Sequence, residues 1–267
     1  MAEFIAFTYN TFLSFQFSKR WMVAISYGFL CHVLFTISVL AMLVSMFFGM
    51  SQSFGKVPHP YSHFANLLLI IQFPLAHSFL LSSMGKKYLL YFSPKNYSLS
   101  LAPTVFVVLA SIQLFILFFF WTPTKIIIWQ ASGTSFFLMC SLYSLSWLLL
   151  IWATIDAGVE LQSGALGWMS LAQNIAPKFP DLPTIGLFKY IRHPIYVSFA
   201  LTTWTTPTWT PDQFFIAIIF TFYCVVAPRL KEKRLEKQFG AKFTNYKSKV
   251  PYMVPSLSIK KPFNQKR

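Results

Sequence analysis

Four long stretches without a charged residue constrain the fold of this chain more than any other feature. They span residues 21–50, 64–84, 103–121 and 134–155. About 20 helical residues cross the roughly 30 Å hydrocarbon core of a bilayer, and each stretch meets or approaches that length. The sequence therefore predicts four membrane-spanning helices.

The composition agrees with this reading. Hydrophobic residues make up 55% of the 267 residues and charged residues only 11%, whereas soluble domains carry about 25% charged residues. This balance excludes a disordered chain and argues against a soluble globular enzyme.

A further apolar segment, Tyr196–Pro228, is divided by a turn at Thr206–Asp212. Each half holds about 16 residues, or about 24 Å of helix, which is short for a full crossing. We therefore expect a helical hairpin here that falls short of the far interface. The predicted fold class is all-α: a polytopic helical membrane protein with four full spans and a C-terminal helical hairpin, or five to six transmembrane helices.

The basic residues are unevenly distributed, and this predicts the orientation. Twelve of the 22 Lys and Arg residues lie between Arg229 and Arg267. If this tail faces the cytoplasm, only Lys56 and Lys125 lie on the opposite side of the membrane, in accord with the positive-inside rule. Both termini are therefore predicted to be cytoplasmic, with the tail against anionic lipid. Nucleic-acid binding is not expected, because no nucleic-acid-binding motif accompanies the basic residues.

We expect a single membrane domain over residues 1–267. Its predicted parts are a four-span N-terminal bundle, a cytoplasmic connector, a helical hairpin and a basic tail, at residues 1–155, 156–193, 194–228 and 229–267. No sequence feature sets the oligomeric state.

Neither the cysteines nor the paired histidines indicate a metal site. The three cysteines lie singly inside apolar runs, at Cys31, Cys140 and Cys224. His59 and His63 are four residues apart but have no third ligand nearby, and a protein-bound zinc ion needs at least three. No metal is therefore expected.

Charged residues gather at the two feet of the hairpin. The first foot contains Arg192, His193 and Tyr196, and the second contains Glu232. Because a hairpin returns to the side from which it left, we expect these residues to meet. Pro194 is expected in the first turn of its helix, where the missing N–H costs nothing.

The second foot has a helical pattern. Glu232, Leu235, Glu236 and Phe239 lie on one helical face, and Gly240 is a plausible C-terminal stop. Glu232 shares its face with apolar residues, which favours a carboxylate turned inward. The apolar residues from Phe243 onward are expected to fold back and cover a pocket.

These segments resemble the C-terminal region of a superfamily of membrane methyltransferases. The pattern is Gly-x-x-x-Tyr-x-Arg-His-Pro-x-Tyr at residues 186–196, then a span, then Leu-x-Glu-x-x-Leu-x-x-x-Phe-Gly-x-x-Phe-x-x-Tyr-x-x-x-Val-Pro at residues 230–251. The superfamily includes isoprenylcysteine carboxyl, phospholipid N- and methanethiol S-methyltransferases. The resemblance covers Thr184–Pro255, about a quarter of the chain.

The resemblance implies that S-adenosylmethionine binds at the cytoplasmic foot of the hairpin. The positions that match the motif, and so the implied cofactor-binding residues, are Gly186, Tyr190, Arg192, His193, Pro194, Tyr196, Glu232 and Tyr246. Glu232 would hold the ammonium group of the cofactor and Arg192 its carboxylate. The rings of Phe188, Tyr190 and Tyr246 would face the sulfonium or stack on adenine.

A weaker resemblance upstream favours the methanethiol S-methyltransferase branch. It consists of His77-Ser78 in the second span, followed by Leu117–Trp121, Pro123 and Trp129. The leading prediction is therefore methyl transfer to a small thiol, methanethiol giving dimethyl sulfide. A thiol is a weak nucleophile until it loses its proton. Arg192, His193 and His77 are the candidate catalytic residues, and the sequence does not choose among them.

Several departures and alternatives accompany this prediction. The superfamily often has two adjacent Glu residues where this chain has Lys231-Glu232, and a Gly where it has Ser198. The stretch 155–161 also differs from the methanethiol branch, so the substrate can differ as well. Within the same class, isoprenylcysteine or a phospholipid amine is the alternative acceptor. Membrane sterol reductases also resemble this C-terminal region, but they bind a nicotinamide cofactor and generally have more spans. The alternative of a different class is a non-enzymatic transporter or scaffold. A transporter would usually show polar residues in several spans, which this chain does not.

Overall fold

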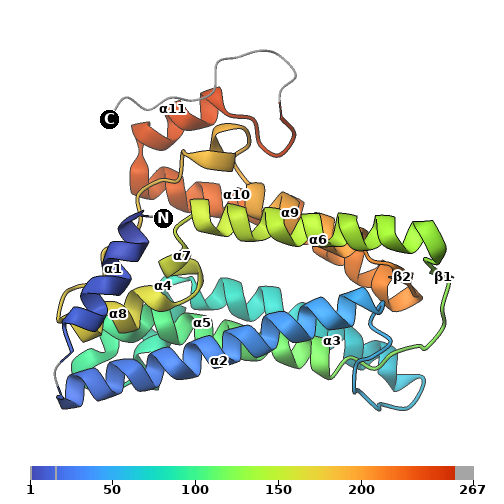
Figure 1. The fold of residues 1–267 in the computed structure, drawn as a ribbon, viewed down its shortest axis with the longest axis horizontal. Coiled ribbons are helices and arrows are strands. Elements are labelled where there is room, and N and C mark those ends of the chain that lie inside the picture. Colours follow the sequence, from blue (N-terminus) through green and yellow to red (C-terminus); the bar gives the residue numbers. More distant parts are fainter. Residues whose placement is uncertain (1, 16, 256–267) are drawn as a thin grey trace. The chain divides into compact units, whose positions relative to one another are not determined.

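The computed structural model describes residues 2–15 and 17–255, and the chain divides into two compact units (Figure 1). The first unit holds residues 1–124 and 159–179, and the second holds residues 125–158 and 180–267. The boundaries of these units are not those of the four parts predicted from the sequence, and the prediction of a single membrane domain with four parts stays a prediction. Each unit is described separately below.

Helices and 3-10 turns are the regular elements in the described residues of the first unit. Its elements are α1 (Ala2–Leu13), α2 (Lys19–Phe47), α3 (Tyr61–Leu80), α4 (Ser83–Leu89), the 3-10 turns η1 (Leu90–Phe92) and η2 (Lys95–Tyr97), α5 (Ser98–Phe119), α7 (Val159–Gln162) and α8 (Ala165–Gln173). The first three predicted spans correspond to α2, α3 and α5. Helix α5 packs against α2, α3 and α8 and so forms the centre of the unit.

Helices α2 and α5 are joined by polar contacts that repeat every seven residues. Side chains on α2 donate to backbone carbonyls on α5 in three pairs: Cys31 to Thr104 at 3.8 Å, Ser38 to Ser111 at 2.7 Å and Ser45 to Phe118 at 3.4 Å. The constant offset shows that the two helices run in the same direction, as the first and third spans must. Small side chains at these positions allow close approach of the helix backbones.

Trp168 of α8 completes this core. Its ring covers Gly28 of α2 so closely that a Cβ atom there would lie 2.6 Å from the Trp168 ring. Its backbone N–H donates to Thr104 Oγ1 at 2.9 Å, and its indole N–H donates to His32 Nε2 at 3.1 Å. The short helix α8 is therefore fixed to both long helices.

The second unit is also helical, with one short strand pair. Its elements are β1 (Trp129–Gln130), α6 (Gly133–Asp156), η3 (Gly186–Lys189), α9 (Pro194–Trp204), β2 (Thr208–Trp209), α10 (Pro211–Phe239) and α11 (Ala241–Lys249). Strands β1 and β2 are antiparallel, with Trp129 opposite Trp209. Helix α9 packs against both α6 and α10.

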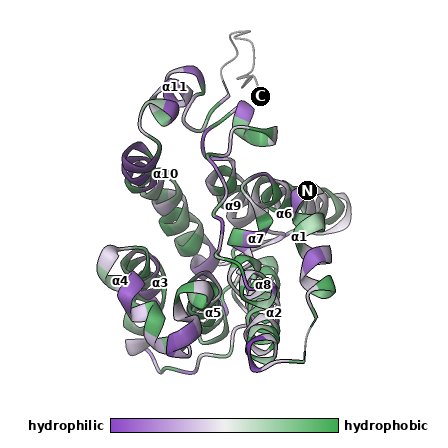
Figure 2. Ribbon diagram, turned by 90° about the vertical axis from the view of Figure 1, so that its left-hand side faces the viewer, coloured by the Kyte–Doolittle hydropathy of each residue, from purple (hydrophilic) through white to green (hydrophobic). Residues whose placement is uncertain are grey.

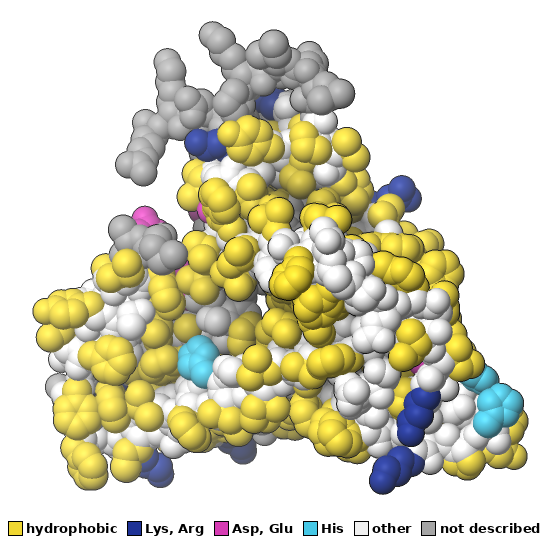
Figure 3. All heavy atoms as spheres, turned by 45° about the vertical axis from the view of Figure 1, so that its right-hand side comes forward, with side chains coloured by type: hydrophobic (Ala, Val, Ile, Leu, Met, Phe, Trp, Pro, Cys, Tyr) yellow, Lys and Arg dark blue, Asp and Glu magenta, His cyan; other side chains and the backbone are white. Residues whose placement is uncertain are grey.

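Five helical segments in the described residues are long and apolar enough to cross a membrane. They are 19–47, 61–80, 95–119, 133–156 and 211–239. Hydrophobic side chains cover much of the outer face of the helices (Figure 3), where lipid takes the place of water. The predicted all-α polytopic membrane fold is confirmed. The predicted orientation of the termini stays a prediction.

The prediction for the hairpin was wrong in one respect. Its first half, α9, is short, with 11 residues. Its second half, α10, has 29 residues, continues past Pro228 and is about 43 Å long. Figure 2 shows that α10 turns from hydrophobic to hydrophilic along its length. The change from apolar to charged residues marks the end of the apolar segment but not the end of the helix, so the two predicted segments form one.

Candidate functional site

The first foot of the hairpin is built on a proline and a glycine. Helix α9 begins at Pro194, as predicted, with His193 as its N-cap residue. The turn η3 begins at Gly186, whose φ of +56° lies in the left-handed region. A side chain at Gly186 would also overlap the carboxylate of Asp156. Glycine is therefore required at this position for conformation and for space.

Asp156 fixes this turn to α6. It is the last residue of α6, and its Oδ2 atom accepts a hydrogen bond from the backbone N–H of Leu187 at 2.9 Å. Glu160, four residues further along the chain, lies in α7 of the first unit. Asp156 is therefore a positioning residue for the loop that leads into Arg192 and His193.

Glu232 of α10 is the centre of the site. Its side chain is only 8% exposed, and its Oε1 atom accepts from Arg192 Nε at 2.8 Å and binds His193 Nε2 at 2.9 Å. Its Oε2 atom lies 3.2 Å from Lys247 Nζ. The expected meeting of Arg192 and His193 with Glu232 is confirmed, and the inward direction of this carboxylate follows from the shared face with Leu235 and Phe239.

Arg192 also holds the segment after α11. Its backbone N–H donates to Pro251 O at 2.9 Å, and its Nη1 atom donates to Lys247 O at 3.0 Å and Val250 O at 2.6 Å. Its Nη2 atom makes no hydrogen bond to the described residues. One guanidinium thus ties the hairpin foot to the end of α11 and keeps one nitrogen for a further acceptor.

A small apolar core supports α11. It consists of Leu182, Phe243, Tyr246 and Val250, with Leu235 and Phe239 packed against it. The Tyr246 hydroxyl donates to Phe188 O at 2.7 Å, and burial raises the pKa of this hydroxyl. As expected, the residues after Gly240 fold back onto the hairpin foot. Tyr246 and Phe188 are buried here, in a position to support the site from behind.

His193 has one bonded and one unbonded ring nitrogen. Its Nε2 atom donates to the Glu232 carboxylate, and its Nδ1 atom has no hydrogen-bond partner among the described residues, although the residue is only 2% exposed. Burial lowers the pKa of His193 to about 4, against the opposing hydrogen bond to Glu232. At neutral pH the ring is therefore uncharged, and Nδ1 is a buried hydrogen-bond acceptor without a donor.

Aromatic rings surround His193. The ring of Tyr252 lies edge-to-face with it at 4.8 Å and that of Tyr196 at 5.9 Å. Tyr252 also donates from its hydroxyl to Val225 O at 2.9 Å and lies 5.5 Å from the guanidinium carbon of Arg192. Tyr190, by contrast, is 58% exposed. The structure therefore brings Tyr196 to the cluster and leaves Tyr190 at the surface.

His77 lies in the first unit. It is in α3, with the ring of Phe73 at 5.6 Å and that of Phe106 at 5.0 Å. The structure therefore does not bring His77 together with Arg192 and His193 in one compact unit.

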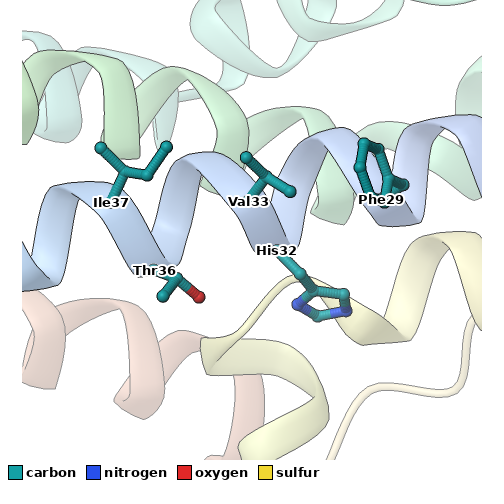
Figure 4. A pocket seen from close by; sticks show the side chains of 5 residues that line it. All are labelled: Phe29, His32, Val33, Thr36 and Ile37. Atoms are coloured by element: carbon teal, nitrogen blue, oxygen red, sulfur yellow. The ribbon is translucent and has the colours of Figure 1, made fainter.

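The sequence analysis missed Lys247, Tyr252 and His32. Lys247 gave no signal, because it is one of many lysines near the C-terminus. His32 had a signal that was overlooked: it is a histidine inside a predicted span, where polar residues are costly and often functional. With Phe29, Val33, Thr36 and Ile37 it lines a shallow, open hollow along α2 (Figure 4).

The cluster has the chemistry to bind a small zwitterion. Arg192 Nη2 offers N–H donors to a carboxylate, the buried Glu232 carboxylate accepts from an ammonium, and His193 Nδ1 accepts a proton or a hydrogen bond. Among the described residues, no group of three or more His, Cys, Asp or Glu side chains is arranged to hold a metal ion.

Comparison with known proteins gives a consistent set of relatives. Methanethiol S-methyltransferase 2 of Bradyrhizobium diazoefficiens is 30% identical over 192 residues, which cover 72% of this chain and 73% of the relative. The methanethiol S-methyltransferase of a Pseudomonas species is 25% identical over 246 residues, covering 90% and 93%. Nurim of Xenopus laevis is 26% identical over 192 residues, covering 64% of each chain. No family model and no solved structure matches the chain.

Proposed function

The chain belongs to the methanethiol S-methyltransferase family, and on this premise we propose that it transfers the methyl group of S-adenosylmethionine to methanethiol, giving dimethyl sulfide. The observation that carries the proposal is the buried Glu232 carboxylate, held between Arg192 and a neutral His193 whose Nδ1 atom has no partner in the described chain. These three residues lie in the segment on which the sequence resemblance rests.

The residues present fit this cofactor. Its methionine part carries one ammonium and one carboxylate, which match Glu232 Oε2 and Arg192 Nη2 respectively. Tyr196 and Tyr252 supply aromatic faces and edges beside His193, and such rings favour a sulfonium cation. The role proposed for Gly186, Pro194 and Tyr246 is to hold the backbone around Arg192 in place. Tyr190 is exposed, and its proposed contact with the cofactor would be at the surface of the site.

His193 is the residue in this set best suited to receive the thiol proton. Arg192 is excluded because a guanidinium stays protonated and cannot accept a proton. His77 belongs to the first unit and contacts the rings of Phe73 and Phe106. His193 is neutral, its Nδ1 lone pair is unbonded, and Glu232 stabilises the protonated ring through Nε2, the arrangement found in base-assisted nucleophiles.

The proton balance follows from these roles. When bound, S-adenosylmethionine would supply an electrophilic methyl carbon, which passes to the thiol sulfur as its bond to the cationic sulfur breaks and leaves a neutral thioether. His193 Nδ1 takes the S–H proton as the new carbon–sulfur bond forms, and Glu232 balances the resulting imidazolium charge. Burial of the cluster excludes the water that would compete for these contacts.

The site is proposed to face the cytoplasm, where the basic tail contacts anionic lipid. The described part of this tail includes Lys231, Lys242 and Lys249. Its last four basic residues lie in 256–267, outside the described residues. Labelling of single cysteines introduced near either terminus, in sealed vesicles, tests this orientation. A terminus labelled from outside right-side-out vesicles is incompatible with it.

Two measurements test the function. Calorimetric titration with S-adenosylhomocysteine and, separately, NADPH is expected to show binding of the first alone; binding of NADPH alone contradicts a methyltransferase. Headspace gas chromatography with methanethiol and S-adenosylmethionine is expected to show dimethyl sulfide. Binding of S-adenosylhomocysteine without formation of dimethyl sulfide refutes methanethiol as the acceptor.

The variant His193→Gln separates binding from proton transfer. The glutamine amide can still donate to Glu232 but supplies no basic nitrogen. It is expected to bind S-adenosylhomocysteine within a few-fold of the wild-type affinity and to lose roughly 100- to 10,000-fold in turnover, the usual contribution of a general base. Unchanged turnover in this variant refutes the role of His193 as proton acceptor.

A further inference from the structure

Lys247 occupies the position that a ligand ammonium needs. Its Nζ atom lies 3.2 Å from Glu232 Oε2. Oε1 of the same carboxylate is already bonded to Arg192 and His193, so Oε2 is the oxygen that remains for a further cation. Lys247 is the only partner of Oε2 in the described part of the chain.

Lys247 also has a second carboxylate within reach. Its Nζ atom lies 2.8 Å from Glu236 Oε1, one helical turn beyond Glu232 on α10. The exposed fractions of the Lys247 and Glu236 side chains are 41% and 43%, whereas that of Glu232 is 8%. The lysine therefore connects one buried and one half-exposed carboxylate, and its own side chain is half-exposed.

The backbone of Lys247 is held independently of its side chain. Its carbonyl oxygen accepts from Arg192 Nη1 at 3.0 Å, and the neighbouring Tyr246 and Val250 are part of the apolar core. Loss of the contact with Glu232, with the contact to Glu236 kept, therefore requires rotation of the lysine side chain only. An ammonium has three N–H donors that rotate freely, unlike the planar guanidinium of arginine, so one hydrogen bond can be lost while the others keep good geometry.

We propose that Lys247 is an internal competitor for the ammonium group of the cofactor: in the free protein it pairs with both Glu232 Oε2 and Glu236, and it gives up Glu232 and keeps Glu236 when the cofactor binds. This inference rests on the proposed function and adds a residue that sets cofactor affinity. One cation replaces another, so the buried carboxylate never lacks a counter-charge, which is costly for a buried ion.

The test is calorimetric titration of Lys247→Met with S-adenosylhomocysteine. Methionine keeps the apolar stem and removes the competing charge, so the dissociation constant is expected to fall about two- to fivefold, as displacement of a half-exposed ion pair predicts. Lys242→Met is the matched control, because Lys242 lies on the same helix and pairs with Asp181 outside the cluster. It is expected to leave the affinity unchanged.

Glu236→Gln gives an independent arm. Without the second carboxylate the displaced lysine has no acceptor, so affinity is expected to fall in the wild-type background and to stay unchanged in the Lys247→Met background. Methylthioadenosine, which lacks the amino-acid part, is expected to bind equally to wild type and Lys247→Met.

The outcomes separate the two proposals. Wild-type binding of S-adenosylhomocysteine together with equal or weaker binding by Lys247→Met overturns the exchange and leaves the proposed function standing. Weaker binding in particular assigns Lys247 to the cofactor carboxylate. Absence of binding by wild type and by Lys247→Met overturns the proposed function, and the exchange with it.

Discussion

Replacement of Glu232 by glutamine is the sharpest perturbation of this site, because it removes one charge and almost no volume. The amide oxygen can replace Oε1 and keep the hydrogen bonds from Arg192 and His193, at 2.8 and 2.9 Å. The amide nitrogen then replaces Oε2, which faces Lys247. Two donors face each other there, and a ligand ammonium would meet the same unfavourable pairing.

The expected loss follows from the interaction removed. A hydrogen bond to a charged group contributes roughly 1.5–3 kcal/mol, which corresponds to about 10- to 150-fold in the dissociation constant of S-adenosylhomocysteine. Calorimetric titration of detergent-purified Glu232→Gln measures this loss directly. Methylthioadenosine, which has no ammonium, is expected to lose far less and so reports whether the rest of the site is intact.

Asp181→Asn is the control for a change of charge near α11. Asp181 pairs with Lys242, and this hydrogen bond lowers the pKa of its carboxyl group, but it makes no contact with Glu232. Its removal is expected to leave the affinity unchanged. If Glu232→Gln binds S-adenosylhomocysteine within threefold of wild type, Glu232 does not hold the ammonium and the assignment of the cluster is refuted.

Three further predictions concern pH and packing. Because the pKa of His193 is lowered to about 4, the unfolded chain binds more protons than the folded chain between pH 6.5 and 4, so stability falls on acidification by about 3 kcal/mol in total; thermal unfolding against pH should show this slope, and His193→Gln should lack it. Gly186→Ala is expected to weaken S-adenosylhomocysteine binding, because its side chain would overlap Asp156 at a positive φ; unchanged affinity would disprove the role of this turn. Gly28→Val is expected to cost about 1–3 kcal/mol by overpacking against Trp168, measured as a lower melting temperature; no change would mean that α8 moves aside freely.

The proximity of the charged residues at the two feet of the hairpin could be predicted from the sequence. A hairpin returns to its starting side, and the spacing of Glu232, Leu235 and Phe239 placed the carboxylate on the apolar face of its helix. The ion pair between Arg192 and Glu232 follows from these two facts. The choice of atoms in this ion pair, Arg192 Nε with a single oxygen of Glu232, could not be predicted, because it depends on how α11 packs.

The partners of Arg192 Nη1 were beyond sequence reasoning for a physical reason. They are the backbone carbonyls of Lys247 and Val250, and every residue has such a carbonyl, so no residue type marks them. The long helix α10 was missed because charge was taken to end the helix at Pro228. The contacts between α2 and α5 could not be predicted from hydropathy, because it identifies a span but not which of its small polar side chains, such as Ser38 and Cys31, face another helix.

Lys231 precedes Glu232 in this chain, so Glu232 is the single carboxylate at this point of the motif. Lys231 is directed towards Tyr196, with its Nζ atom 5.8 Å from the ring centroid, so it adds no acceptor to the cluster. Oε1 of Glu232 is used by Arg192 and His193. Oε2 is therefore the oxygen of Glu232 that is open to a ligand ammonium, and Lys247 lies 3.2 Å from the same atom, which is why we expect the two cations to compete for it.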